Sequence, residues 1–130
     1  MSQVTQESSP ILGRLDPVVL DCQHPRELAG FYSALLGQEL DPNGDDDWQS
    51  LAEPGLSLCF RRVEGAVPPP WPVSRPHLDL IVEDFASGHA TVTRLGAVPL
   101  DPVEPPPAEG DRRQRVYADP AGHVFSLWLD

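Results

Sequence analysis

HLDLIVEDFASGHATVTRLGAVPL, residues 77–100, repeats the pattern of an earlier stretch although few letters agree. The earlier stretch is VVLDCQHPRELAGFYSALLGQEL, residues 18–40. A shift of 59 positions, which carries Leu36 onto Leu95, also carries Gly37 onto Gly96 and superposes two short apolar runs. Self-similarity at a fixed offset is the signature of repeated structural units. The sequence therefore predicts an internally duplicated fold.

The first copy contains the clearest local pattern, an amphipathic helix. Its apolar residues recur at helical spacing: Leu28, Phe31, Tyr32, Leu35 and Leu36. Pro25 suits the first helical turn, and Gly37 suits a left-handed stop. The apolar run 17–22 predicts a strand before the helix, and three strands are expected after it at 38–40, 47–53 and 55–63. The first half thus reads as βαβββ.

The second copy follows a proline-rich connector at 66–76 and has the same order. A strand is expected at 77–82, then a helix at 84–95 that Asp84 caps and Gly96 ends, then strands at 97–100, 112–119 and 123–130. This order predicts an α+β fold in which two paired βαβββ modules form curved sheets around a cavity, with the helices on the outer face. We expect a flexible N-terminal arm at 1–14 and one domain at 15–130, with modules at 15–65 and 77–130.

Composition excludes two classes of partner. The 130 residues carry nine arginines, no lysine and 20 acidic residues, for a formal charge of -11. Nucleic-acid binding is not expected, because phosphate neutralisation requires clustered basic residues. No apolar run approaches the length of a membrane span, and two cysteines in apolar runs fit a reducing compartment. We therefore expect a cytoplasmic protein, and the absence of lysine with abundant Pro, Ala, Arg and Gly suggests a GC-rich genome.

The chain resembles the vicinal oxygen chelate superfamily, which includes glyoxalases, bleomycin-resistance proteins and extradiol dioxygenases. Three stretches carry the resemblance: LDCQHPRELAGFYSALLG at 20–37, HLDLIVEDFASGHATVTRLGA at 77–97 and RVYADPAGHVFSLW at 115–128. The resemblance implies paired βαβββ modules, a cupped active-site cavity and commonly a homodimer. It leaves function open, since members include lyases, isomerases, dioxygenases and drug-sequestering binders.

Most members of this superfamily use a divalent metal, and the resemblance places four ligand positions on this chain. They fall near Pro17 or Val18, near Cys59, on His77 and on Ser126. His77 is the only family-type ligand retained, because Ser126 replaces the usual carboxylate with a neutral hydroxyl and Pro17 and Val18 cannot ligate. One imidazole with one thiol would hold a hard cation poorly. We therefore expect no metal cofactor.

Strand alternation predicts which side chains line the cavity. On the strand at 77–82, Leu78, Leu80 and Val82 should pack under the helix. On the first strand, Val18, Leu20 and Cys22 should do the same. The opposite faces supply a predicted ligand-binding set: Asp21, Arg61, His77, Asp79, Ser126 and Trp128, with Trp48 from the third strand. The residues alone assign no catalytic role.

Two functions remain open at this point. The first is a metal-independent small-molecule binder that sequesters a basic drug or metabolite in an acidic cleft. The alternative is a lyase, isomerase or dioxygenase that holds a divalent metal with unconventional ligands around His77, recruited from Asp21, Asp79 or Cys59. A third possibility, an interaction module without any ligand, requires the cavity to be filled by its own side chains.

Overall fold

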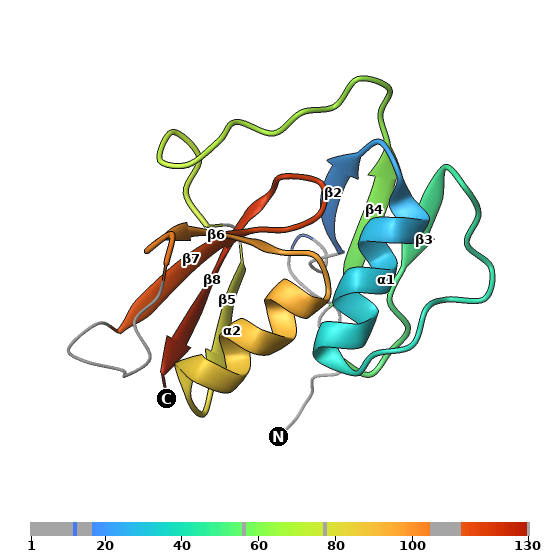
Figure 1. Cartoon of the computed structure of the whole chain (residues 1–130). Helices are drawn as coiled ribbons and strands as arrows, with labels where there is room; N and C mark the ends of the chain where they lie inside the picture. The colour runs from blue at the N-terminus through green and yellow to red at the C-terminus, as the bar shows by residue number, and fades with distance from the viewer. Residues whose placement is uncertain (1–11, 13–16, 56, 77, 105–112, 130) are drawn as a thin grey trace.

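The computed structural model describes residues 12, 17–55, 57–76, 78–104 and 113–129. These residues form two modules, each with one helix and one open sheet. The first module contains β2 (Val18–Cys22), α1 (Pro25–Leu36), β3 (Trp48–Ser50) and β4 (Leu58–Arg62). The second contains β5 (Leu78–Val82), α2 (Phe85–Arg94), β6 (Val98–Asp101), β7 (Gln114–Ala118) and β8 (Val124–Leu129). Both helices lie on the same side of the molecule (Figure 1).

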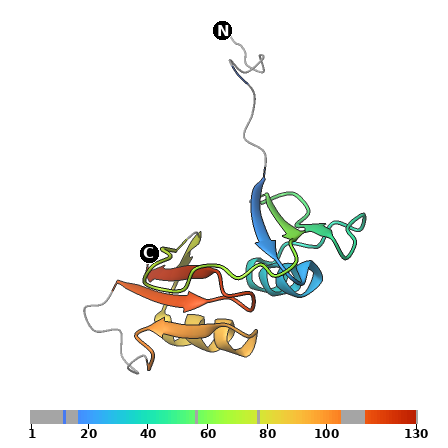
Figure 2. The ribbon, with the colours of Figure 1, turned by 90° about the horizontal axis from the view of Figure 1, so that it is seen from above.

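The sheet topology confirms the predicted duplication. The strand orders are β2-β4-β3 and β5-β8-β7-β6, so the first strand of each module lies at a sheet edge. In each module that strand pairs in parallel with the last strand. The α+β architecture with paired modules is therefore as the repeat predicted, and the modules lie side by side, joined by the connector (Figure 2).

The predicted strand at 38–40 is the most reduced of those expected after α1. The segment 38–40 contributes a single bridge, between Leu40 and Leu51. Its continuation is an exposed acidic loop whose carboxylates accept from its own backbone. Asp41 accepts from the Asn43 N–H, and Asp45 accepts from the N–H groups of Asp47 and Trp48. Such Asx turns compete with ladder pairing, which explains why a strand does not extend here.

Both helices begin and end as their sequences predict. Gly37 ends α1 with φ of 70°, in the left-handed region where glycine is favoured. Asp84 caps α2 by accepting from the Ser87 N–H at 2.7 Å. In α2, Phe85 and Val92 are buried. The described part of the chain contains no helix long and apolar enough to cross a membrane.

The two mid-helix glycines meet very different surroundings. A Cβ at Gly30 in α1 would have no neighbour within 4 Å, whereas one at Gly88 in α2 would lie 3.1 Å from Leu127 and 3.3 Å from Val82. Gly88 therefore lets α2 lie close against its sheet. Alanine is the better helix former by up to about 1 kcal/mol. We expect Gly30→Ala to stabilise the protein by about that amount and Gly88→Ala to give no gain, measured by urea unfolding; equal gains would contradict the close packing of α2.

The modules are joined by a buried polar cluster at the turn between β7 and β8. The Tyr32 hydroxyl, on α1, donates to Asp119 at 2.7 Å. The other Asp119 oxygen accepts from the N–H groups of Ala121 and His123, each at 2.9 Å. His123 Nε2 lies 2.8 Å from the carbonyl oxygen of Asp21 in β2, and it is therefore the donor, because a carbonyl only accepts. This cluster ties both α1 and β2 to the second module.

Aromatic packing surrounds this cluster. Phe31 of α1 lies edge-on to Phe125 of β8 at 5.9 Å, and Tyr117 stacks on Phe125 at 5.7 Å. Tyr32 stacks on Phe60 of β4 at 5.8 Å. These rings are almost fully buried, so one hydrophobic core extends across both modules.

Candidate functional site

The side chains of Asp79, Ser126 and Trp128 form one hydrogen-bonded row on the face of the second sheet opposite α2. Asp79 and Ser126 are paired across β5 and β8. The Ser126 hydroxyl donates to Asp79 Oδ1, and Trp128 Nε1 donates to the Ser126 oxygen at 2.9 Å. Ser126 is fully buried, whereas Asp79 is exposed. The hydrogen bond from Ser126 therefore holds the Asp79 carboxylate, a hydrogen-bond acceptor, in one orientation at the protein surface. A carboxylate oriented in this way suits a cation or a hydrogen-bond donor.

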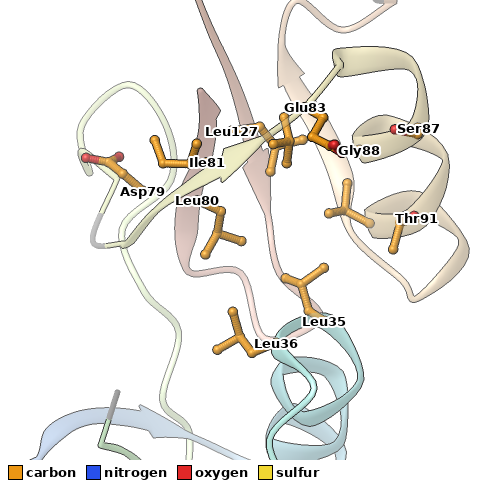
Figure 3. A pocket seen from close by; sticks show the side chains of 12 residues that line it. Leu35, Leu36, Asp79, Leu80, Ile81, Glu83, Ser87, Gly88, Thr91 and Leu127 are labelled. Atoms are coloured by element: carbon orange, nitrogen blue, oxygen red, sulfur yellow. The ribbon is translucent and has the colours of Figure 1, made fainter. Parts of the chain in front are cut away.

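An apolar pocket of about 460 Å³ adjoins Asp79 around the open edge of β5. Figure 3 shows Leu35 and Leu36 of α1 near Leu80, while Asp79 points away from them on the other side of the strand. The charged side chains that line this pocket are Asp79 and Glu83, both acidic. Its remaining walls are mostly aliphatic, so it combines apolar contact area with negative charge.

The first sheet carries a second group of the predicted residues, and here the charges are balanced. Arg61 donates twice to Asp21, at 2.8 and 3.1 Å. These hydrogen bonds, with the charge of the guanidinium, hold the pKa of Asp21 below its usual value. Trp48 is the cross-strand neighbour of Arg61 and is 41% exposed. This surface therefore presents the Trp48 ring beside an Asp21–Arg61 ion pair whose charges cancel.

The alternation of side chains along the strands predicted correctly which face of the sheet most of these residues occupy. Leu78, Leu80 and Val82 pack against the core, and Asp79 is exposed. Val18 differs, because it is 39% exposed instead of packed under the helix; it is the first residue of β2 and lies at the strand end. His77 lies outside the described residues, so its predicted role stays a prediction.

The described members of the predicted ligand-binding set thus form two groups, one on each sheet. Asp79 is the member that lines the pocket beside β5. Sequence reasoning missed the pocket's other walls, which come from the end of α1 and from α2: Leu35, Leu36, Ser87 and Thr91. Ser87 and Thr91 are spaced i, i+4 on one face of α2 with Gly88, a pattern that could have marked this face.

Three of the four positions implied for a metal lie within the described residues, and these three carry no carboxylate or imidazole. Val18 is aliphatic, Cys59 is a thiol that is 5% exposed, and the Ser126 hydroxyl is already held between Asp79 and Trp128. Within the described ranges, no three His, Cys, Asp or Glu side chains lie close enough to hold a metal ion. Oxygen-rich ligand sets are what hard divalent cations require, and the described part of this site offers Asp79 as its carboxylate.

Paired βαβββ modules, with a helix on one face of each open sheet, define the vicinal oxygen chelate class of fold. The family model for the glyoxalase-like domain matches residues 17–128, and the chain belongs to this glyoxalase-like family. A search of curated proteins finds no significant match.

Solved structures show the same fold at low identity. The genomically encoded fosfomycin resistance protein FosX from Listeria monocytogenes aligns with a TM-score of 0.65 at 16% identity, covering 92% of this chain and 93% of that one. A glyoxalase/bleomycin resistance protein/dioxygenase family enzyme from Burkholderia phytofirmans aligns with a TM-score of 0.60 at 14% identity, covering 88% of this chain and 96% of that one. A possible glyoxalase from Bacillus cereus aligns with a TM-score of 0.63 at 13% identity, covering 88% of this chain and 97% of that one. A mutant of the Listeria protein was solved with Mn(II) and 1S,2S-dihydroxypropylphosphonic acid.

Proposed function

We propose that this glyoxalase-like protein binds a small organic cation with an apolar body and does not need a divalent metal to do so. The observation that carries the proposal is the fixed, exposed carboxylate of Asp79 beside a pocket whose charged lining is acidic. A cation placed against Asp79 would put its apolar part on Ile81 or in the aliphatic pocket. The charge of -11 on the whole chain attracts such ligands over a longer range.

Sequestration of a basic drug or metabolite is the biological role that fits this site. Binding without turnover needs shape and charge complementarity but no activated water or nucleophile. We place it in the cytoplasm, where the two buried thiols Cys22 and Cys59 would stay reduced.

A metal-dependent lyase, isomerase or dioxygenase is the second candidate function. The Mn(II) complex of FosX favours it, since that protein shares the fold. In this chain, His77 would have to act with Asp79, Asp21 or Cys59. Asp21 is engaged by Arg61 and Cys59 is buried, which disfavours that donor set.

The test compares two ligands of one shape, 4-phenylbutylamine and 4-phenylbutanol, by titration calorimetry on protein treated with EDTA. The amine is a cation at neutral pH and the alcohol is neutral. We expect the amine to bind at least about tenfold more tightly, because a charge-assisted contact with Asp79 is worth about 1.5 kcal/mol or more and tenfold corresponds to about 1.4 kcal/mol. Equal affinities would overturn the proposal. One tightly bound metal per chain before EDTA, with binding lost after it, would favour the enzyme instead.

We also expect the protein to be a homodimer in solution. Within the described sheets, β6 pairs with one strand, so it leaves one edge uncovered away from the pocket beside β5. Uncovered edges favour association, and a symmetric pair of chains can cover them. Light scattering should give twice the chain mass of 14.2 kDa. A mass of one chain at high protein concentration would count against this prediction.

A further inference from the structure

A second hollow, of about 360 Å³, lies between β2 and the first part of the connector. The connector is fixed where it leaves the first module. The Val63 N–H donates to the Cys22 carbonyl at 2.8 Å, and Gln23 Nε2 donates to the Ala66 carbonyl at 2.9 Å. Farther along, the Pro68 ring packs against Gly122, where an added Cβ would be 3.4 Å away. These contacts hold the connector beside β2 and leave a defined space between them.

The walls of this hollow are apolar and poor in donors. Val19 of β2 forms one wall, and Val67, Pro68 and Pro69 form the other. Val19 is 39% exposed and Val67 is 78% exposed, so a ligand could remove substantial apolar surface from water. The two prolines have no backbone N–H, and the connector wall there presents rings and carbonyl oxygens.

The polar end of the hollow is electrically balanced. Asp21 lines it, but both oxygens of this carboxylate accept from Arg61. His123 also lines it, with Nε2 donating to the Asp21 carbonyl. A charged ligand would lose hydration here without gaining an uncompensated partner. This balance distinguishes the hollow from the acidic pocket beside β5.

We propose that the hollow between β2 and the connector binds an uncharged, ring-containing apolar molecule, at a site separate from the Asp79 pocket. The ring lies against Pro68 and Pro69, and any single polar group faces the Asp21–Arg61 pair. The volume is within the range of small-molecule sites. This inference does not depend on the binding of a cation at Asp79, since β2 and β5 belong to different sheets.

The test uses N-phenyl-1-naphthylamine, an uncharged dye whose fluorescence rises in apolar surroundings, with the full chain. The connector offers a matched pair of variants, because Val67 and Val73 are both 78% exposed but Val67 lines the hollow and Val73 does not. We expect saturable binding that Val67→Asp weakens by about tenfold or more, since it places a charge against the dye. Val73→Asp should change it by less than about twofold.

Two more variants separate this site from the other one. Val19→Asp, on the opposite wall, should weaken binding of the dye as Val67→Asp does, whereas Leu36→Asp, in the pocket beside β5, should leave dye binding unchanged. Circular dichroism and thermal unfolding check that each variant is folded. The inference is overturned if the dye does not saturate, if Val67→Asp and Val73→Asp act equally, or if Leu36→Asp in the β5 pocket abolishes binding while Val67→Asp does not.

Discussion

Replacing Asp119 by alanine is expected to lower the free energy of unfolding by about 3 kcal/mol or more. The substitution removes one acceptor from three donors, the Tyr32 hydroxyl and the N–H groups of Ala121 and His123. Asp119 and Tyr32 are buried, at 3% and 1% exposed, so water cannot readily replace the lost partner. Each abandoned donor costs about 1 to 3 kcal/mol, and the sum is reduced because the turn can relax.

Asparagine at the same position is the matched control for this prediction. Asp119→Asn keeps an oxygen that can accept from Ala121 and His123, and its amide group can donate to the Tyr32 hydroxyl. We expect a loss of about 1 kcal/mol or less, measured by urea unfolding with circular dichroism. Equal losses for the two variants would show that the side-chain oxygen is not what stabilises the turn.

The pH dependence of stability provides a separate prediction. Burial raises the pKa of Asp119 above its ordinary 3.8, against the opposing effects of Tyr32 and His123. The folded state therefore holds this proton more tightly than the unfolded state, and stability falls as pH rises from 3.8 through the raised pKa. Asp119→Asn should lose this decline, so the stability of the native protein minus that of the variant should decrease with rising pH in this window. A difference that increases with pH would contradict the assignment.

Asp21 and Asp84 affect a different pH range. Hydrogen bonds to Arg61 and to the N–H of Ser87, respectively, lower their pKa values. Their contribution is present above the ordinary pKa of 3.8 and is lost as pH falls through the lowered values. Both groups are exposed, which screens the effect, and both are unchanged in Asp119→Asn, so they cancel in the comparison with the native protein.

The fold could be predicted from the sequence because its signals are local and repeated. The stripe from Leu28 to Leu36, with Pro25 and Gly37 at its ends, specifies α1 through backbone and apolar periodicity. The second helix contains residues of lower helix propensity, but its sequence pattern matches that of the first helix at a constant shift of 59 positions, and this match predicted it. Where the prediction was incomplete, at 38–40, pairing is limited to the bridge between Leu40 and Leu51, and the loop after it forms Asx turns, an outcome that apolar periodicity does not encode.

The candidate site could be predicted only in part, because alternation gives the face of a residue and not its neighbours. It placed Asp79 on the open face of β5, but it could not show that Asp21 would be neutralised by Arg61. The pocket beside β5 is built from Leu35 and Leu36, distant in sequence, which pack beside it only after the modules associate. Contacts between modules depend on how the modules pack together, and the apolar periodicity of either module alone does not predict them.

Replacing Asp79 by alanine should weaken a cationic ligand by about 1.5 to 3 kcal/mol while changing a neutral analogue much less. The cation loses its fixed acceptor, whereas the apolar surface proposed for the neutral part of either ligand, on Ile81 or in the aliphatic pocket, remains. Stability should change less than affinity, since Asp79 is exposed and adds little apolar packing. The Ser126 O–H loses its acceptor in this variant, although the Ser126 oxygen still accepts from Trp128 Nε1, and Asp79→Asn avoids this cost to stability.

Two controls make this experiment specific. Asp79→Asn keeps an acceptor for Ser126 but removes the charge, and it should lose most of the preference for 4-phenylbutylamine over 4-phenylbutanol while staying as stable as the native protein. Asp21→Asn removes a charge that Arg61 already balances, so it should affect that preference far less. If Asp79→Ala unfolds the protein, or if its folded fraction binds the amine as tightly as before, then Asp79 has a structural role through Ser126, and the cation must bind elsewhere.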